Sequence, residues 1–307
     1  MGYKRAGFQV IGNVEIDPRV NALYVANNHP KYNYNMDLRQ FNQISNSELP
    51  EELFDLDILD GSPPCSTFSV AGKREEGWGV EKKFREGQKK QTLDDLFFVF
   101  LETVEKLNPK IFVAENVKGI IQGNAKVYCK RIVEKAKAIG YEIQMFLLNS
   151  AQMDVPQARE RVFFIGNRCS FPKLNMMFKR PVIKFGDVRS EMGVEIRPGK
   201  MTEMLKYMRS DDTDMAKICE RISLKRTCFS VKIAHDHLVC PTIVSQSTFI
   251  RAFDKKKYSD LDFINVQTFP QDYDFGNEST QYICGMSVPP NMMAHIATKI
   301  WEQWLKK

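Results

Sequence analysis

The sequence predicts an α/β protein with a doubly wound sheet, and three observations support this fold class. Short apolar runs typical of buried strands alternate with helical patterns over the first 170 residues. Several of these strands end in turn signals or polar residues, at the place where open α/β sheets bind ligands. The composition, with 43% hydrophobic and 27% charged residues in a chain of 307, is that of a globular protein with room for one large and one smaller domain.

The N-terminal segment predicts the end of a helix followed by a strand. Residues 2–8 have the pattern of a last helical turn that closes on Gly7, and alternating apolar residues up to Ile16 indicate the strand. Glu15, at the end of this strand, stands where dinucleotide-type folds bind a ribose. Neither a first strand nor a Gly-rich turn precedes it, so we expect a chain that begins inside its own cofactor domain.

The following elements continue the pattern. Residues 19–29 predict a helix, and Asp37 comes at the end of a short, polar third strand. The apolar run 53–59 predicts a buried parallel strand, after which two prolines hold Cys65 rigidly beyond its carboxyl end. Residues 70–92, rich in Gly, Lys and Glu, predict a loop that is too polar to pack.

The alternation extends to residue 165. Helical spacing predicts helices at 93–107 and 128–139, and apolar runs predict strands at 111–114, 141–148 and 162–165. Glu115 and Asn116 end the first of these strands, and Arg159 and Arg161 precede the last. A thiol, a carboxyl group and guanidinium groups at the strand ends of one domain suit nucleophilic attack on an electron-poor ring.

After residue 171 the composition changes. The periodicity weakens, and residues 171–257 contain 18 Lys and Arg against 10 Asp and Glu, although the net charge of the whole chain is +6. A basic segment beside a near-neutral body indicates a polyanionic partner such as nucleic acid, and a solvated surface is the alternative. Regular α/β patterning returns at residues 282–290, followed by an amphipathic helix at 291–304.

The cysteine pattern and the hydropathy argue against several classes of protein. The 7 cysteines show no Cys-x-x-Cys or Cys/His ligand spacing, which argues against zinc and favours free thiols in a reducing compartment. The chain has no signal peptide and no uncharged apolar run of about 18 residues, so we expect a soluble, cytoplasmic protein that binds no metal. The absence of a Gly-x-Gly-x-x-Gly fingerprint argues against a nicotinamide dehydrogenase.

Five motifs occur in the order typical of one family, and together they span nearly the whole chain. The sequence resembles the cytosine carbon-5 DNA methyltransferases in PPCSTFSVAGKR (63–74), ENVKG (115–119), VPQARERVFFIG (155–166), VQTFPQDY (266–273) and CGMSVPP (284–290). Five strings in order are far more specific than a single motif. The resemblance implies a Rossmann-like S-adenosylmethionine-dependent methyltransferase domain with a mixed, mostly parallel sheet at 1–170, a smaller target-recognition domain at 171–276, and a segment at 277–307 that returns to the catalytic domain.

The resemblance also implies a mechanism. The Cys65 thiolate would add to carbon 6 of a cytosine flipped out of duplex DNA, and Glu115 would hold and protonate the N3 edge of the ring. Carbon 5 would then take the methyl group of S-adenosylmethionine, and loss of the carbon 5 proton would release Cys65. Arg159 and Arg161 would steady the ring oxygen, the flanking phosphate and the active-site loop, and the sequence does not divide these roles between them.

The resemblance assigns further contacts to the cofactor and to DNA. For S-adenosylmethionine it implies Glu15 at the ribose, Ile16 at the adenine face, Asp37 at the adenine amine, Pro63 beside the methyl donor, and Ser287 and Val288 from the last motif. For DNA it implies Ser69, Arg74 and Gln157, with loop 70–92 as a closing lid, and Arg251, Lys255, Lys256 and Lys257 as candidate phosphate contacts. Each of these residues also has a plain structural interpretation, such as a surface charge, a strand residue or a brace of the pocket.

The sequence departs from the family pattern at two places. The strand and the Phe-x-Gly-x-Gly turn with which the family begins are not present, and Met286 stands where the family usually has Asn, which weakens a hydrogen bond on the cofactor side. Three hypotheses account for the first departure: a sequence without its true N-terminus, a two-chain enzyme whose companion chain supplies the segment, and a non-catalytic relative that still binds DNA. The intact set of Cys65, Glu115 and Arg159 argues against the third.

The expected function is DNA (cytosine-5-)-methyltransferase activity of a bacterial or phage restriction-modification type. We expect a monomer that acts on duplex DNA beside a cognate restriction endonuclease. The alternative within the family is a tRNA cytosine-5 methyltransferase, because residues 227–230 resemble a Cys-Phe-Thr segment of that branch, whereas residues 229–243 favour the DNA-modifying form. The DNA target sequence depends on the variable domain and does not follow from one chain.

Overall fold

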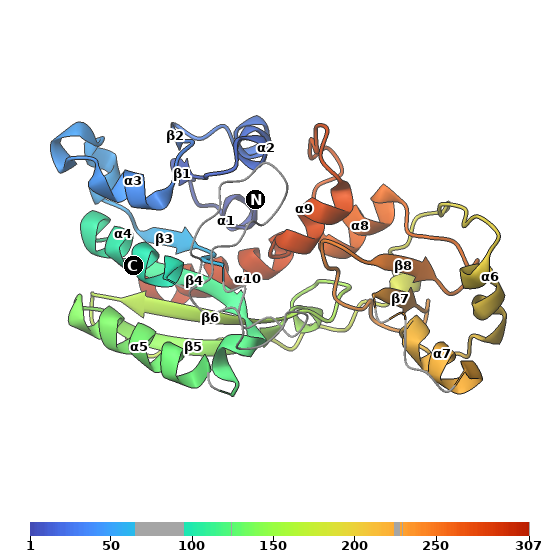
Figure 1. Cartoon of the computed structure of the whole chain (residues 1–307). Coiled ribbons are helices and arrows are strands. Elements are labelled where there is room, and N and C mark those ends of the chain that lie inside the picture. Colours follow the sequence, from blue (N-terminus) through green and yellow to red (C-terminus); the bar gives the residue numbers. More distant parts are fainter. Residues whose placement is uncertain (65–94, 124, 224–227, 229, 307) are drawn as a thin grey trace. The chain divides into compact units, whose positions relative to one another are not determined.

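The computed structural model describes residues 1–64, 95–123, 125–223, 228 and 230–306, and the chain divides into two compact units (Figure 1). The first, here called the sheet unit, comprises residues 10–148, 160–176 and 299–307. The second, here called the helical unit, comprises residues 1–9, 149–159 and 177–298. The predicted domain limits at 170 and 276 do not coincide with these units, because residues 1–9, 149–159 and 277–298 pack with residues 177–276.

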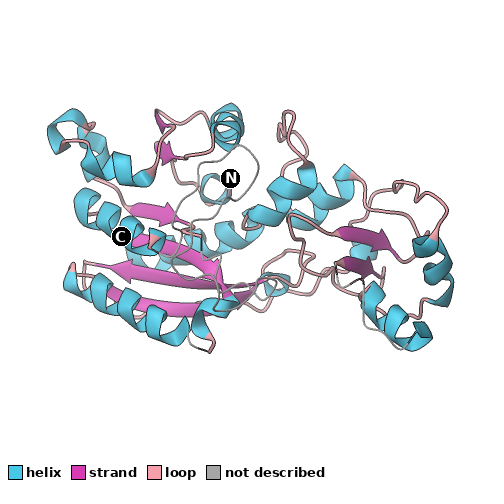
Figure 2. Cartoon of the chain, viewed as in Figure 1, coloured by secondary structure: helices cyan, strands magenta, loops and turns pink. Residues whose placement is uncertain are grey.

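The sheet unit is built on a four-stranded sheet that is mixed, as the sequence predicts. Its strands lie in the order β3 (Ile58–Gly61), β4 (Ile111–Val117), β6 (Glu160–Asn167) and β5 (Glu142–Asn149). β3 runs parallel to β4, and β4 runs antiparallel to β6. Two further strands, β1 (Gly12–Val14) and β2 (Tyr32–Tyr34), pair in parallel as a separate sheet (Figure 2).

The helices of the sheet unit are α2 (Pro18–Asn28), α3 (Leu38–Gln43), α4 (Leu96–Leu107) and α5 (Ala125–Ala138), with 3-10 turns η1 (Asn46–Glu48), η2 (Glu51–Phe54) and η3 (Lys118–Ile121) and a π-helical turn η7 (Trp301–Leu305). The helices α2, α4 and α5 lie near their predicted positions, whereas the sequence pattern predicts no helix at α3. The strand predicted at 53–59 is shorter than expected. Its first residues belong to η2, and Asp55 and Asp57 interrupt the apolar run before β3 begins.

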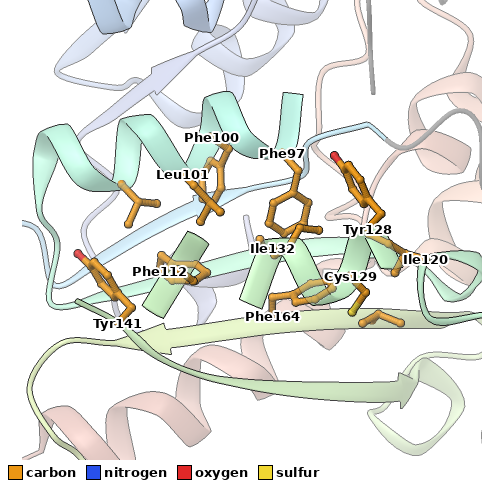
Figure 3. Packing of buried hydrophobic residues seen from close by; sticks show 14 residues of the cluster. Phe97, Phe100, Leu101, Phe112, Ile120, Tyr128, Cys129, Ile132, Tyr141 and Phe164 are labelled. Carbon is orange, nitrogen blue, oxygen red and sulfur yellow. The ribbon is translucent and has the colours of Figure 1, made fainter. Parts of the chain in front are cut away.

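One hydrophobic core joins the four-stranded sheet to α4 and α5 (Figure 3). Phe97 and Leu101 of α4, Ile132 of α5, Phe112 of β4 and Phe164 of β6 are each at most 1% exposed. The rings of Phe97 and Phe164 meet edge to face, with their centroids 5.1 Å apart. Burial of each such side chain contributes about 1.5–3 kcal/mol, so this core fixes the strands whose ends carry the predicted site.

β3 passes close to α4 at its carboxyl end. A Cβ atom at Gly61 would lie 2.4 Å from Cε2 of Phe100, a contact that no larger residue could make without displacing the ring. Asp60 and Gly61 are the last two residues of the strand. The close approach fixes the direction in which the chain leaves β3 toward Pro63.

The helical unit has a small core of its own. Its helices are α1 (Gly2–Arg5), α6 (Lys200–Met204), α7 (Met215–Ser223), α8 (Asp260–Gln267), α9 (Thr280–Met286) and α10 (Pro290–Ile300). Its strands β7 (Val231–Ala234) and β8 (Thr248–Arg251) pair in parallel, and its 3-10 turns are η4 (Ser150–Gln152), η5 (Phe185–Asp187) and η6 (Leu205–Tyr207). Ile218, Ile233 and Ile250, from α7, β7 and β8, are each at most 1% exposed and belong to one cluster.

Hydropathy places no bilayer-spanning element in the part of the chain that the structure describes. None of its helices is both long enough and apolar enough to cross a membrane.

Candidate active site

The neighbouring strands β3 and β4 hold the segment that leads to the predicted nucleophile. Pro63 is buried just beyond β3, and the side-chain amide of Asn116 on β4 donates a hydrogen bond to its carbonyl oxygen over 3.1 Å. The same side chain accepts from the backbone N–H of Val117 at 2.9 Å, which fixes its rotamer. Cys65, Ser69 and Arg74 themselves lie outside the described residues. Asn116 therefore anchors the backbone two residues before Cys65.

The predicted acid and one of the two predicted arginines meet on the sheet. In the antiparallel register of β4 and β6, Glu115 lies opposite Phe163 and Val117 lies opposite Arg161, so Glu115 and Arg161 are diagonal neighbours on one face. Nε of Arg161 lies 2.8 Å from Oε1 of Glu115, and the two side chains are only 16% and 13% exposed. A short charge-assisted contact with so little exposure holds the carboxylate in one orientation.

Arg159 has a different position from Arg161, although the two are separated by one residue. It precedes β6, belongs to the helical unit and is 2% exposed. Its guanidinium donates to the carbonyl oxygens of Ile243, at 2.8 Å, and Gly285, at 2.9 Å. The structure thus separates the two arginines that the sequence could not distinguish: Arg161 contacts the acid, and Arg159 joins the backbone at Ile243 to the backbone at Gly285 in the last motif.

Gln157, predicted as a DNA contact, is fully buried and serves as a brace. Its amide nitrogen donates to Oε1 of Gln267 at 2.6 Å, and its oxygen accepts from the N–H of Ile243 at 2.9 Å. Gln267 in turn donates to the carbonyl oxygen of Ser287 at 2.8 Å. The DNA-contact prediction is corrected, because both polar ends of Gln157 are satisfied inside the helical unit. The sequence did not predict the role of Gln267, the buried last residue of α8.

The residues predicted for the cofactor lie at strand and helix ends. Glu15 follows β1, and its Oε1 accepts a hydrogen bond from the backbone N–H of Asp17 at 2.8 Å. This bond orients the Glu15 carboxylate next to the neighbouring residue Ile16. Ile16 is 36% exposed. Asp37 caps α3, accepts from the N–H of Arg39 at 2.8 Å and forms an ion pair with Nη1 of Arg39 at 3.4 Å. A carboxylate beside an exposed aliphatic side chain suits a ribose diol beside an adenine face, so the residues of the sheet unit fit S-adenosylmethionine chemically.

Ser287 and Val288 lie in the helical unit, immediately after α9. The Ser287 hydroxyl donates to the carbonyl oxygen of Ile283 at 2.6 Å. Met286, which stands where the family usually has Asn, is 50% exposed at the end of the same helix.

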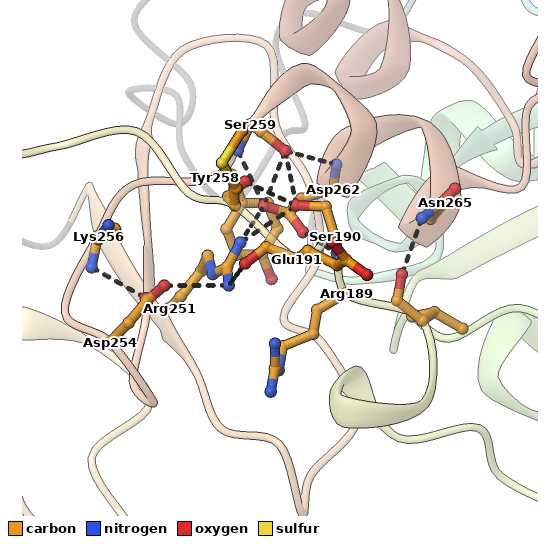
Figure 4. A network of polar contacts seen from close by, with 12 residues as sticks. Arg189, Ser190, Glu191, Arg251, Asp254, Lys256, Tyr258, Ser259, Asp262 and Asn265 are labelled. Carbon is orange, nitrogen blue, oxygen red and sulfur yellow. Dashed lines mark hydrogen bonds and ion pairs between the residues drawn. The ribbon is translucent and has the colours of Figure 1, made fainter.

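Arg251 is a buried ion-pair residue, and its prediction as a phosphate contact is corrected. It is 0% exposed, and its guanidinium lies 3.0 Å from Asp254 and 3.4 Å from Asp262 (Figure 4). It also donates to the hydroxyl of Ser190 at 3.1 Å. Its partners Ser190, Asp254 and Asp262 all belong to the helical unit, so the positive charge of Arg251 is neutralised within that unit. Among the neighbouring lysines, Lys255 and Lys257 are exposed, and Lys256 forms an ion pair with Glu195 at 2.6 Å.

Replacing Arg251 with methionine is expected to lower the free energy of unfolding by about 3–5 kcal/mol, because it leaves the fully buried Asp262 carboxylate without the cation that neutralises it. Urea unfolding followed by circular dichroism measures the loss. Lys257→Met is the matched control and should change stability by about 0.5 kcal/mol or less, since that side chain is exposed. A second change, Asp262→Asn, should recover part of the loss, and equal stability of Arg251→Met and the wild type would contradict the assignment.

Solved structures place the fold among the α/β methyltransferases. One is a prophage-encoded E. coli protein described as a DNA modification methyltransferase, with a TM-score of 0.68 at 19% identity over 99% of this chain and 95% of that one. Another is DNMT2 of Spodoptera frugiperda, with a TM-score of 0.63 at 16% identity over 98% and 95% of the two chains. The predicted fold class is confirmed.

Sequence comparison identifies the family. The model of the C-5 cytosine-specific DNA methylases matches residues 1–214, and the chain belongs to this family. It is 26% identical to the type II methyltransferase M.DdeI of Desulfomicrobium norvegicum over 97% of this chain and 85% of the relative. It is 27% identical to the type II methyltransferase M.Sau96I of Staphylococcus aureus over 98% and 72%. The predicted enzyme class, a DNA (cytosine-5-)-methyltransferase, is confirmed.

Proposed function

We propose that the chain methylates carbon 5 of a flipped-out cytosine in a specific duplex DNA sequence, with Cys65 as the nucleophile. The observation that supports this most is the Glu115–Arg161 ion pair of 2.8 Å on the sheet that also anchors Pro63. An acid oriented by a cation, beside the segment that leads to a cysteine, is what addition to a pyrimidine ring requires.

In the proposed reaction the Cys65 thiolate forms a bond to carbon 6 of the cytosine. The electron pair of the 5,6 double bond moves to carbon 5, while Glu115, which takes up a proton when the base binds, donates that proton to N3, so that no uncompensated anion builds up. S-adenosylmethionine, when bound, supplies the methyl group that carbon 5 takes. A base then removes the carbon 5 proton, which restores the 5,6 double bond and expels the Cys65 thiolate, and the N3 proton returns to Glu115. The cytosine must first leave the helical stack, because its carbon 6 is inaccessible in duplex DNA.

Arg161 is assigned to orient Glu115 and to approach the ring oxygen. Its Nε engages Oε1 of Glu115, so Oε2 is the oxygen that we assign to N3. Arg159 is assigned a positioning role, because its two guanidinium bonds hold the backbone at Ile243 and Gly285. The family resemblance does not say which arginine has which role, and these assignments give each arginine one of them.

For the cofactor, we assign Glu15 to the ribose hydroxyls, Ile16 to the adenine face and Asp37 to the adenine amine, with Pro63 near the methyl donor. Their support is chemical: a carboxylate held by the Asp17 N–H stands next to an exposed apolar side chain. Ser287 and Val288 stay predictions from the motif that contains them.

The biological setting is proposed from the relatives. Several are named type II methyltransferases, so we infer that this chain is the modification enzyme of a restriction-modification system with a cognate endonuclease. We further propose that it acts as a monomer on duplex DNA and that Lys255 and Lys257 contact phosphates.

The test is methyl transfer from radiolabelled S-adenosylmethionine to unmethylated bacterial genomic DNA, with total tRNA as the parallel substrate. We expect incorporation into DNA, and bisulfite sequencing of the product then gives the target sequence. Transfer to tRNA and not to DNA would reverse the choice of substrate. Transfer to neither, with DNA binding intact, would support a non-catalytic or two-chain protein.

A further inference from the structure

Backbone hydrogen bonds link the two ends of the turn at residues 252–257 of the helical unit. The N–H of Arg251 donates to the carbonyl oxygen of Lys256 at 2.8 Å, and the N–H of Lys255 donates back to Arg251 at 3.0 Å. Lys257 and Val194 exchange two backbone hydrogen bonds of 2.8 and 2.9 Å. Lys255 has a φ of 57°, a left-handed conformation that costs a lysine on the order of 1 kcal/mol. The surrounding bonds keep this strained residue in place.

The buried Arg251 contacts this turn at Asp254 and Lys256 (Figure 4). The Arg251 guanidinium binds Asp254 at 3.0 Å, and the carboxylate of Asp254 also accepts from the N–H of Lys256 at 3.2 Å. Burying an ion pair costs free energy of desolvation. In return, a turn that is already ordered loses little conformational entropy when it binds a partner. The network therefore preorganises the turn.

The turn presents one large aromatic side chain to solvent. Phe253 is 68% exposed, and the guanidinium carbon of Arg189 lies 4.4 Å from its ring centroid. Arg189 is itself held by Asp236 at 2.9 Å, so a fixed cation supports the ring. Lys255 and Lys257 on the same turn are exposed. An exposed aromatic face among cations is the combination that binds stacked bases together with their phosphates.

We propose that Phe253 stacks on a base of the bound DNA while Lys255 and Lys257 contact the adjacent phosphates. The inference rests on the proposed function, because base faces in an intact duplex are covered and become accessible where a nucleotide leaves the stack. Phe253 thus supports the opened step. No motif of the family resemblance contains this residue, and its signal is structural: a preorganised turn with an exposed aromatic side chain at its tip.

The experiment compares Phe253→Ala, Phe253→Tyr and the control Tyr207→Ala, which removes another aromatic side chain that is 60% exposed. Filter binding to fragments of unmethylated genomic DNA, at salt concentrations from about 50 to 200 mM, gives the affinity and its salt slope. Phe253→Ala should weaken binding about tenfold without changing the slope, because stacking releases no counterions. Phe253→Tyr and Tyr207→Ala should bind like the wild type. The double variant Lys255→Gln/Lys257→Gln should instead reduce the slope by about 2.

A second readout reports the opened base step directly. Topoisomerase relaxation of a closed plasmid in the presence of wild type should change its linking number, and Phe253→Ala should reduce that change at equal DNA occupancy. Unchanged affinity and unwinding in Phe253→Ala would overturn the proposal. If Phe253→Ala bound DNA like the wild type but the protein alone had a different sedimentation coefficient, the proposal would be overturned in favour of a contact between Phe253 and another protein chain.

The outcomes separate this inference from the proposed function. Phe253-dependent binding and unwinding without any methyl transfer would leave the inference standing and defeat the proposed reaction. Normal methyl transfer with Phe253→Ala binding like the wild type would defeat the inference alone. A wild-type chain that binds no DNA would defeat both.

Discussion

Replacing Cys65 with alanine is expected to reduce methyl transfer to background while DNA binding changes little. The proposed reaction needs a covalent bond to carbon 6, and without it carbon 5 of cytosine does not become nucleophilic. Tritium transfer from S-adenosylmethionine to genomic DNA measures the loss, and filter binding measures the DNA affinity. Methyl transfer above one per cent of wild type would refute the nucleophile assignment.

Other cysteines provide the controls for this result. Burial raises the pKa of the Cys240 and Cys284 thiols to about 12, so both stay protonated at neutral pH and cannot replace a nucleophile. Cys169 is exposed, and Cys169→Ser should keep full activity. Duplex DNA that contains 5-fluorocytosine should trap a covalent complex with wild type and with Cys169→Ser, because fluorine at carbon 5 cannot leave as a proton does. Cys65→Ala should trap none.

The sequence predicted those parts of the site whose positions follow from the ends of strands. Asn116 and Glu115 end a strand that is apolar from Ile111 to Ala114, and the structure places both at that strand's carboxyl end. Asn116 also braces the segment before Cys65, through its bond to Pro63. The local sequence pattern was enough to predict these positions, because an apolar run marks a buried strand and the polar residues that follow it mark its carboxyl end.

The sequence could not predict roles that depend on distant partners. Arg159 and Arg161 share a spacing that would place both on one face of a strand, but β6 begins at Glu160, and only Arg161 lies on the sheet. The partners of Arg159, at residues 243 and 285, are far away in the chain. Arg251 looked like one of several cations in a basic segment, and its burial depends on Ser190 and Asp262, which no local pattern connects to it. The two corrected contact residues, Gln157 and Arg251, are therefore both polar side chains satisfied by tertiary contacts.

Replacing Glu115 with glutamine is expected to lower kcat by about a hundredfold or more while the affinity for DNA stays near that of wild type. Glutamine is nearly isosteric and can still approach N3, but it cannot deliver a proton there, so charge accumulates on the ring as the thiolate adds. The change also removes the anionic partner of Arg161, whose Nε lies 2.8 Å from the native carboxylate. Single-turnover methylation of saturating genomic DNA measures the rate of the chemical step.

The matched control is Glu160→Gln, on the same pair of strands. Glu160 pairs with Lys118 at 2.8 Å, but its side chain is 42% exposed, so the change should leave kcat within about twofold. Urea unfolding of both variants shows whether a rate change reflects lost structure. If Glu115→Gln kept more than about a third of the wild-type rate, the proton at N3 would have to come from another group. If it lost the rate and also the trapped adduct with 5-fluorocytosine DNA, Glu115 would act before the final elimination, because the adduct is trapped only when the addition of Cys65 and the methyl transfer have both succeeded.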